Sequence, residues 1–145
     1  MPNLKEQGFT LLEMLLVLAV LMTVVLIVIP SYQNYTIRKE EKRFFELFQQ
    51  DIYFAQSQTH ATTQTAKVVF REKKESYEIF TDIQTIVLSR KIPKSIQLKK
   101  TSNLTEIYFN SNGTVVQSGT LRFATSSGEK AVTVHLGGGR VVFSE

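Results

Sequence analysis

The fold is decided by a stretch near the N-terminus and by the apolar run that continues it. The stretch reads Lys5-Glu6-Gln7-Gly8-Phe9-Thr10-Leu11-Leu12-Glu13, and the run extends to Ile29. Between Phe9 and Ile29 the only polar residues are Thr10, Glu13 and Thr23. As a helix, this run would be about 31 Å long, close to the hydrocarbon thickness of a bilayer. A helix that is apolar on every face is difficult to bury in a domain of this size, so we predict a membrane-spanning helix.

Glu13 is an ionisable residue inside this run, one helical turn after Phe9. A carboxylate there costs several kcal/mol unless it is paired, protonated or close to the lipid headgroups. Two interpretations follow. Glu13 either lies at the headgroups and has no special role, or it has a functional partner.

The residues before the run do not form a secretory signal peptide, because Met1 to Gly8 contain no apolar core. The small residue Gly8 precedes the run. Cleavage after Gly8 would keep the helix on the mature chain and would leave a free amine on Phe9. That amine would lie one turn from Glu13 of the same chain, or opposite Glu13 of a neighbouring helix. The two opposite charges would then relieve each other's burial cost.

The order of Gly8, Phe9, Thr10, Leu11, Leu12 and Glu13, followed by an apolar run that ends at Pro30, resembles the class III signal of type IV prepilins and pseudopilins. The resemblance covers about the first 35 residues. It implies that a membrane prepilin peptidase cuts between Gly8 and Phe9 and methylates the new amine of Phe9. It also implies that Glu13 guides the docking of subunits into a helical filament, and that the chain has the pilin-like α+β fold. On this basis we expect a leader at 1–8, a transmembrane and assembly helix at 9–30, an amphipathic continuation at 31–60 and a β-rich head at 61–145.

Length and composition limit how the head is stabilised. The chain has 145 residues and no cysteine, so the head has neither disulfides nor cysteine-ligated metals and depends on packing. An exported domain without disulfides suits a Gram-positive cell surface slightly better than a periplasm. The net charge is +4.

The positions of the basic residues do not set the orientation of the helix in the membrane. Arg38, Lys39, Lys42 and Arg43 follow the apolar run, whereas Lys5 precedes it. Counted alone, these charges would place the head in the cytoplasm. The family resemblance implies the opposite, a cytoplasmic leader and an extracellular head, and we adopt that orientation.

After Pro30, which we expect to end or kink the first helix, a helical pattern resumes from Ser31 to about Thr59. Apolar residues recur on one stripe, at Ile37, Phe44, Phe48, Ile52 and Ala55. We expect this stripe to pack on the protein's own sheet; the alternative is a partner surface. We expect the charged residues between the first two stripe positions to be solvated and to form i, i+3 and i+4 pairs: Arg38, Lys39, Glu40, Glu41, Lys42 and Arg43.

Beyond Thr62 the pattern changes to short runs of β type separated by turn residues. We predict an antiparallel head of about six to eight short strands. The candidate strands are 66–70, 77–81, 85–88, 95–98, 106–109, 120–124, 131–136 and 140–143. The sequence Lys91-Ile92-Pro93 interrupts one run, so its neighbours should be edge strands or a crossing between sheets.

The segment from Ile107 through Asn112-Gly113 to Ser118-Gly119 and Leu121 also resembles, more loosely, the head of the H-type minor pseudopilins of type II secretion. In those heads a strand, an Asn-Gly turn, a Gly-Thr dipeptide and a second strand recur near the C-terminus. This resemblance favours a minor subunit over a major one.

The sequence offers no set of residues for catalysis or for a metal or cofactor. His60 and His135, the only histidines, lack neighbours at ligand spacing and are better interpreted as ordinary surface or strand residues. Gly137-Gly138-Gly139-Arg140 lacks a following helix, so we interpret it as a hairpin and not as an anion cradle. We predict that the protein is not an enzyme.

One run of basic residues is a candidate nucleic-acid contact. Arg90, Lys91, Lys94, Lys99 and Lys100 have no acidic residue between them. On one face, they would neutralise several phosphates without reading sequence. The alternative is a solvated basic edge that prevents strand-on-strand aggregation.

The resemblance therefore implies a minor pseudopilin, and within that class the D-type subunit of the Gram-positive competence machinery. Such a subunit would help to assemble or cap a filament that brings exogenous DNA through the envelope. Its partners would be prepilin peptidase, other major and minor pseudopilins, the membrane before assembly, and DNA. The alternatives are the equivalent subunit of a type II secretion or type IV pilus system, and a single-pass anchored surface domain that binds a ligand.

Overall fold

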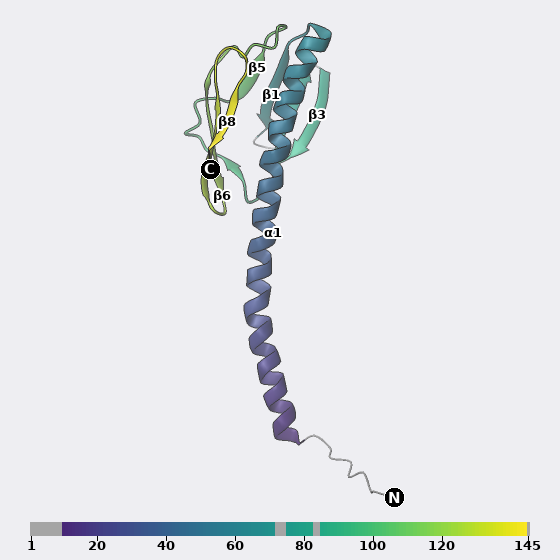
Figure 1. The fold of residues 1–145 in the computed structure, drawn as a ribbon, viewed down its shortest axis with the longest axis vertical. Coiled ribbons are helices and arrows are strands. Elements are labelled where there is room, and N and C mark those ends of the chain that lie inside the picture. Colours follow the sequence, from purple (N-terminus) through teal and green to yellow (C-terminus); the bar gives the residue numbers. More distant parts are fainter. Residues whose placement is uncertain (1–9, 72–74, 83–84, 145) are drawn as a thin grey trace, which may run out of the picture. The chain divides into compact units, whose positions relative to one another are not determined.

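The computed structural model describes residues 10–71, 75–82 and 85–144, apart from the side chains at positions 30 and 31. The described part of the chain starts with one long helix, α1 (Leu11–Thr62). Eight strands follow in the described part: β1 (Ala66–Arg71), β2 (Ser76–Thr81), β3 (Thr85–Lys91), β4 (Gln97–Leu98), β5 (Glu106–Phe109), β6 (Gly119–Thr125), β7 (Gly128–Val134) and β8 (Val141–Ser144) (Figure 1). The predicted pilin-like α+β class is confirmed, and each predicted strand is present with ends displaced by at most about three residues.

Helix α1 runs without a break from its first residue to Thr62, so of the two outcomes expected at Pro30, an end or a kink, the end is wrong. It ends where Thr63 takes a left-handed conformation with φ 55°, a geometry that closes many helices. The chain divides into two compact units, one up to Thr36 and one from Ile37 to Glu145. The second unit, called the head below, contains the rest of α1 and all the strands.

The strands form two antiparallel four-stranded sheets, ordered β3-β2-β1-β5 and β4-β6-β7-β8. Strands β3 and β4 are both at sheet edges, and residues 92–96 cross from one sheet to the other. The prediction drawn from Lys91-Ile92-Pro93 is therefore confirmed in both its parts. A second connection is made by Val115, which forms β-bridges with Phe109 of β5 and with Gly137 between β7 and β8, and so links the two sheets.

The core of the head lies where α1 meets both sheets. Phe44, Phe48, Ile52 and Ala55 are buried along one face of the helix, while the adjacent Phe54 stays exposed. The prediction that the stripe packs on the protein's own sheets is confirmed for these four residues, which have almost no accessible area left for a partner. The fifth predicted member, Ile37, is only partly buried.

One charged residue of α1 departs from the prediction. Glu41 is only 4% exposed, whereas its neighbours Glu40 and Lys42 are solvated as expected. Its carboxylate accepts hydrogen bonds of 2.8 Å from both the backbone N and the Oγ of Ser126, in the turn between β6 and β7. A buried carboxylate needs such donors, and here it fastens the helix to the second sheet.

Candidate functional site

Glu13 lies in the first turn of α1, and its side chain is exposed. Its backbone N donates to the Oγ1 of Thr10 at 3.3 Å and to the carbonyl of Thr10 at 3.1 Å. Thr10 is therefore the N-cap, and Glu13 is the acidic residue three positions later that favours a helix start. A negative charge is also stabilised at this end of a helix by the aligned peptide dipoles. Gly8 and Phe9, the predicted processing residues, lie outside the described residues.

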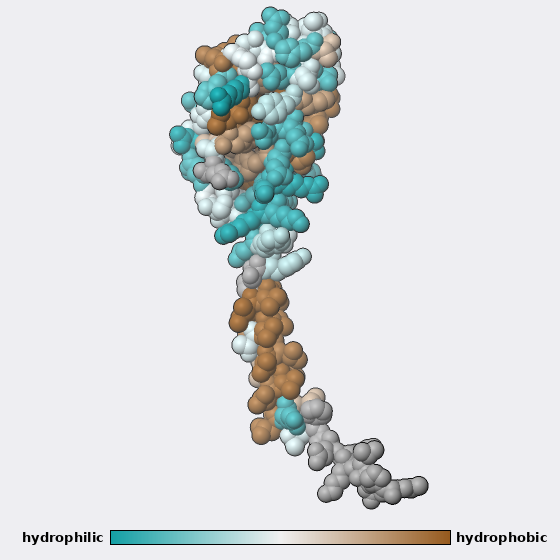
Figure 2. Space-filling view, viewed as in Figure 1, coloured by the Kyte–Doolittle hydropathy of each residue, from teal (hydrophilic) through white to brown (hydrophobic). Residues whose placement is uncertain are grey.

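The apolar part of α1 exposes its side chains on all sides. From Leu11 to Ile29 the exposed fraction of the large apolar side chains runs from 45% at Val17 to 79% at Leu11. Figure 2 shows this part as a continuous hydrophobic surface, with no polar band on the visible face comparable to that of the head. By length and composition, α1 can cross a membrane. Exposure on this scale is unfavourable in water, so this segment requires an apolar environment.

The five basic residues proposed as a nucleic-acid contact do not act as one free patch. Arg90 donates from Nε and, at 3.0 Å, from Nη2 to the carboxylate of Asp51, which is almost fully buried. Lys99 lies at the edge of the other sheet and pairs with Glu129. Lys91, Lys94 and Lys100 are exposed, and no salt bridge is recorded for them within the described part of the chain. A nucleic-acid contact would therefore rest on three lysines.

Asp51 is the centre of a buried polar group that sequence analysis missed. Besides Arg90, it accepts a hydrogen bond of 2.6 Å from the Tyr77 hydroxyl on β2. Burial, and then the hydrogen bond to Asp51, raise the pKa of the Tyr77 phenol well above its ordinary value. The same carboxylate raises the pKa of Arg90. The group joins α1, β2 and β3 through contacts among its own members, which indicates a structural role.

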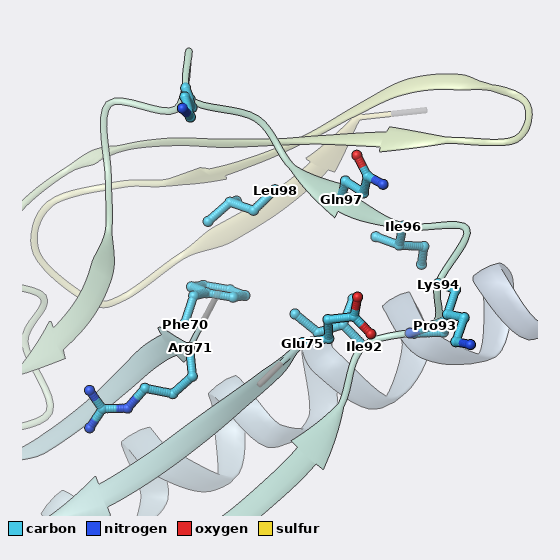
Figure 3. Close-up of a pocket in the computed structure, with 10 residues that line it drawn as sticks. Phe70, Arg71, Glu75, Ile92, Pro93, Lys94, Ile96, Gln97 and Leu98 are labelled. Carbon is cyan, nitrogen blue, oxygen red and sulfur yellow. The ribbon is translucent and has the colours of Figure 1, made fainter. Parts of the chain in front are cut away.

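A hollow of about 260 Å³ opens beside the crossover between the sheets (Figure 3). Phe70, Ile92, Ile96 and Leu98 line it with apolar side chains, and the charged Arg71, Glu75, Lys94 and Lys100 are also part of its wall. It contains no histidine and, among the described residues, only one carboxylate. This arrangement offers neither a paired acid and base nor a nucleophile with its base.

The glycine-rich turn and the histidines have structural positions. Gln56, near the end of α1, donates from Nε2 to the carbonyl oxygens of Gly113 at 2.9 Å and Gly138 at 3.0 Å. The glycine-rich turn thus presents the carbonyl oxygen of Gly138 to the helix, whereas an anion cradle would present backbone N–H groups. His60 lies over Gly113, and His135 is exposed just after β7. No group of three or more potential metal ligands occurs among the described residues.

Solved structures share this arrangement of one long helix on two antiparallel sheets. The type IV minor pilin FimU of Pseudomonas aeruginosa is 12% identical with a TM-score of 0.56, over 78% of this chain and 91% of FimU. The minor pseudopilin EpsH from the Type 2 Secretion System of Vibrio cholerae is 15% identical with a TM-score of 0.56, over 72% of this chain and 96% of EpsH. No curated protein sequence matches the chain. These likenesses define the class: the fold is that of the type IV pilins and pseudopilins.

Two family profiles match the sequence itself. Residues 3–29 match the prokaryotic N-terminal methylation motif, and residues 46–138 match the type II transport protein GspH. The chain therefore belongs to the GspH family of type II transport proteins, whose members are minor pseudopilins. The family is structural and not enzymatic. The methylation motif implies processing by prepilin peptidase, and the family implies partnership with other pseudopilins. The apolar helix is typical of membrane-anchored prepilins that assemble into pilus-like structures.

Sequence analysis missed three residues that organise the head: Glu41, Asp51 and Gln56. Glu41 lies between the first two members of the apolar stripe of α1, Asp51 precedes its member Ile52, and Gln56 follows its last member. A polar residue directly beside a buried stripe is one available signal. Their partners come from residues about 26 to 85 positions further along the chain, so local pattern alone does not identify them.

Proposed function

We propose that the mature chain begins at Phe9 and joins a pilus-like filament as a minor subunit, with Glu13 guiding its docking. The proposal rests on the chain's membership of the GspH family together with the position of Glu13 at the start of an exposed apolar helix. In the filament, the apolar helices would pack against one another, so that neighbouring helices take the place of lipid around each of them. Glu13 would then pair with the amine of a neighbouring subunit, because two opposite charges relieve each other's cost in an apolar medium.

We also propose the corresponding division of the chain. Residues 1–8 are a leader, 9–30 span the membrane before assembly, 31–60 continue the helix, and 61–145 complete the head. The leader faces the cytoplasm and the head faces outward. After extraction from the membrane the subunit resides in the filament at the cell surface.

The transport system that this subunit serves is a separate question. The family match favours a type II secretion or type IV pilus-like machinery. The competence interpretation, in which the filament brings in DNA, has as its support the cysteine-free head and the net charge of +4. Deletion of the gene distinguishes them: loss of transformation with normal secretion supports competence, and loss of protein secretion with normal transformation supports the secretion system.

The substitution Glu13→Val tests the assembly role. We expect processing to continue, because the peptidase site at Gly8 and Phe9 is intact, and incorporation into filaments to be lost. Gly8→Val is the matched control, since it should leave the full-length precursor in the membrane. The measurement is the mass of the N-terminal peptide together with the amount of the subunit in sheared filaments. Normal incorporation of the Glu13→Val subunit would contradict the assembly role.

A further inference from the structure

The end of the head at which α1 enters carries a concentration of exposed basic residues. The helix and the crossover between the sheets come together there, since a shallow hollow is lined by Ile37 and Glu40 from α1 and by Pro93 and its neighbours from the crossover. Figure 2 shows hydrophilic side chains gathered on this part of the helix. We call the exposed cations of these two segments the basic collar, which consists of Arg38, Lys39, Lys42, Arg43, Lys91 and Lys94.

The buried position of Glu41 leaves the collar more basic than the sequence indicates. In the sequence Glu41 balances the adjacent cations, but in the fold the residue is only 4% exposed and its carboxylate accepts from Ser126. Among the described residues, the exposed acids next to the collar on α1 and in the hollow that joins it to the crossover are Glu40, Glu46 and Glu75. Glu46 is 3.9 Å from Lys42 and offsets part of its charge. Cations therefore outnumber exposed carboxylates at the collar.

The collar begins shortly after the predicted membrane-spanning segment in the sequence. Arg38 follows Ile29, the last residue of the apolar run, by only about two and a half helical turns. Cations directly after a membrane segment favour retention on the cytoplasmic side, so their presence on an exported head is unfavourable for insertion. A compensating interaction outside the membrane would account for them.

We propose that the basic collar binds the phosphates of anionic phospholipids in the leaflet facing the head, and so holds the subunit at the membrane until it enters a filament. Guanidinium and ammonium groups form charge-assisted hydrogen bonds with phosphate oxygens, and anionic surfaces attract cations within a Debye length. The inference rests on the proposed function, because it requires the helix in the membrane and the head outside. It gives Lys91 and Lys94 a lipid partner in place of DNA.

The full-length chain in nanodiscs tests this proposal. Because the chain has no cysteine, Ser127→Cys provides a single site for a fluorescent donor, in the exposed turn next to the residue that binds Glu41. The discs contain an acceptor lipid in phosphatidylcholine, alone or with phosphatidylglycerol. We expect greater energy transfer in the phosphatidylglycerol discs and loss of this difference at high salt. Equal transfer in both discs would overturn the proposal.

Paired substitutions locate the effect. We expect Lys91→Gln with Lys94→Gln to weaken the phosphatidylglycerol-dependent association about fivefold per cation removed. The matched control is Lys67→Gln with Arg140→Gln, which removes two cations from the end of the head where α1 stops, and it should leave the association unchanged. An equal loss in both pairs would mean that net charge alone is responsible, and would overturn the collar.

Two further outcomes separate this proposal from its alternatives. If the collar pair loses retention of short duplex DNA but keeps its response to phosphatidylglycerol, the lysines serve nucleic acid and the lipid proposal is wrong. A chain that does not remain in discs of either composition contradicts the membrane residence on which the proposed function depends. A chain that remains in the discs without responding to anionic lipid contradicts the collar alone.

Discussion

At the scale of single residues, the head depends on carboxylates that are buried and fully engaged. Asp51 receives a phenol hydroxyl from Tyr77 and a guanidinium from Arg90, so its charge is compensated inside the core. Removal of one member of such a group costs more than the group contributes as a whole, because the others are left unpaired. Arg90 is therefore not available to an external phosphate, because binding one would leave the buried Asp51 without its cation.

The Tyr77 phenol predicts a loss of stability in alkaline solution. Its pKa is raised by burial and by Asp51, so the folded protein holds the proton when the unfolded chain, with an ordinary pKa of about 10, releases it. The unfolded state then binds fewer protons, and the free energy of unfolding falls as pH rises above about 10. Denaturant unfolding of the full-length chain in detergent, at about pH 9 and about pH 11, measures this. Tyr77→Phe should show the smaller fall; an equal fall in both proteins would contradict the prediction.

The substitution Glu41→Ala is expected to destabilise the head. It removes the two hydrogen bonds that the buried carboxylate accepts from Ser126, and a hydrogen bond to a charged group contributes about 1.5–3 kcal/mol. Glu40→Ala provides the matched control, since it removes the same side chain from the adjacent, exposed position and should change the free energy of unfolding by less than about 0.5 kcal/mol. Equal effects at the two positions would show that the contact with Ser126 is unimportant.

At the scale of elements, strand positions were predictable because each strand has a local signature. The alternation around Arg122 and the turn at Ser127-Gly128 define β6 and β7 from neighbouring residues alone. The interruption at Pro93 indicated the crossover in the same way. Strand order was not predictable, because the pairing of β1 with β5 joins segments about forty residues apart and depends on how both sheets cover the helix.

The same limit applied to the candidate site. Roles for Gly8, Phe9 and Glu13 could be predicted because their motif is contiguous in sequence, and they stay predictions. The basic run from Arg90 to Lys100 was also contiguous, yet folding pairs two of its members with Asp51 and Glu129, from distant segments. Charge runs describe the chain before folding, and the distribution of exposed charge after folding depends on where the carboxylates are buried.

The end of α1 is joined to the glycine turns by Gln56, and this contact can be measured as a coupling energy. In Gly139→Ala the new Cβ would lie 2.5 Å from Nε2 of Gln56, at a backbone φ of +69° that also strains alanine. We expect Gly139→Ala and Gln56→Ala each to destabilise the head. The double variant should lose less than the sum, by about 0.5–3 kcal/mol, because the clash requires both side chains.

A substitution at a second glycine, Gly128, separates the effect of backbone strain from that of the steric clash with Gln56. Gly128 also has a positive φ, +133°, but an added Cβ would meet nothing within 4 Å. Gly128→Ala should therefore destabilise through backbone strain alone and show no coupling to Gln56→Ala. Additive losses for the Gly139→Ala and Gln56→Ala pair would contradict the predicted contact.

At the scale of the whole head, the aromatic side chains Phe44 and Phe48 connect the helix to both sheets. The ring centroid of Phe48 lies 5.1 Å from that of Tyr77 and 5.6 Å from that of Phe70 in the first sheet. It lies 6.1 Å from that of Phe123 and 6.3 Å from that of Phe143 in the second. The two sheets pair with each other only through Val115 among the described residues, so this cluster is their main common support.

We therefore expect Phe48→Ala to destabilise the head by about 3–5 kcal/mol and to weaken both sheets together. Native-state hydrogen exchange of the full-length chain in detergent resolves this, since amides of β2 and of β6 should lose protection to the same extent. Phe54→Ala is the matched control, because it makes the same substitution on the same helix at a side chain that is 36% exposed, and should cost less than about 1.5 kcal/mol. If β6 kept its protection while β2 lost it, the sheets would be separate cooperative units, and the subunit would dock into a filament as two bodies rather than one.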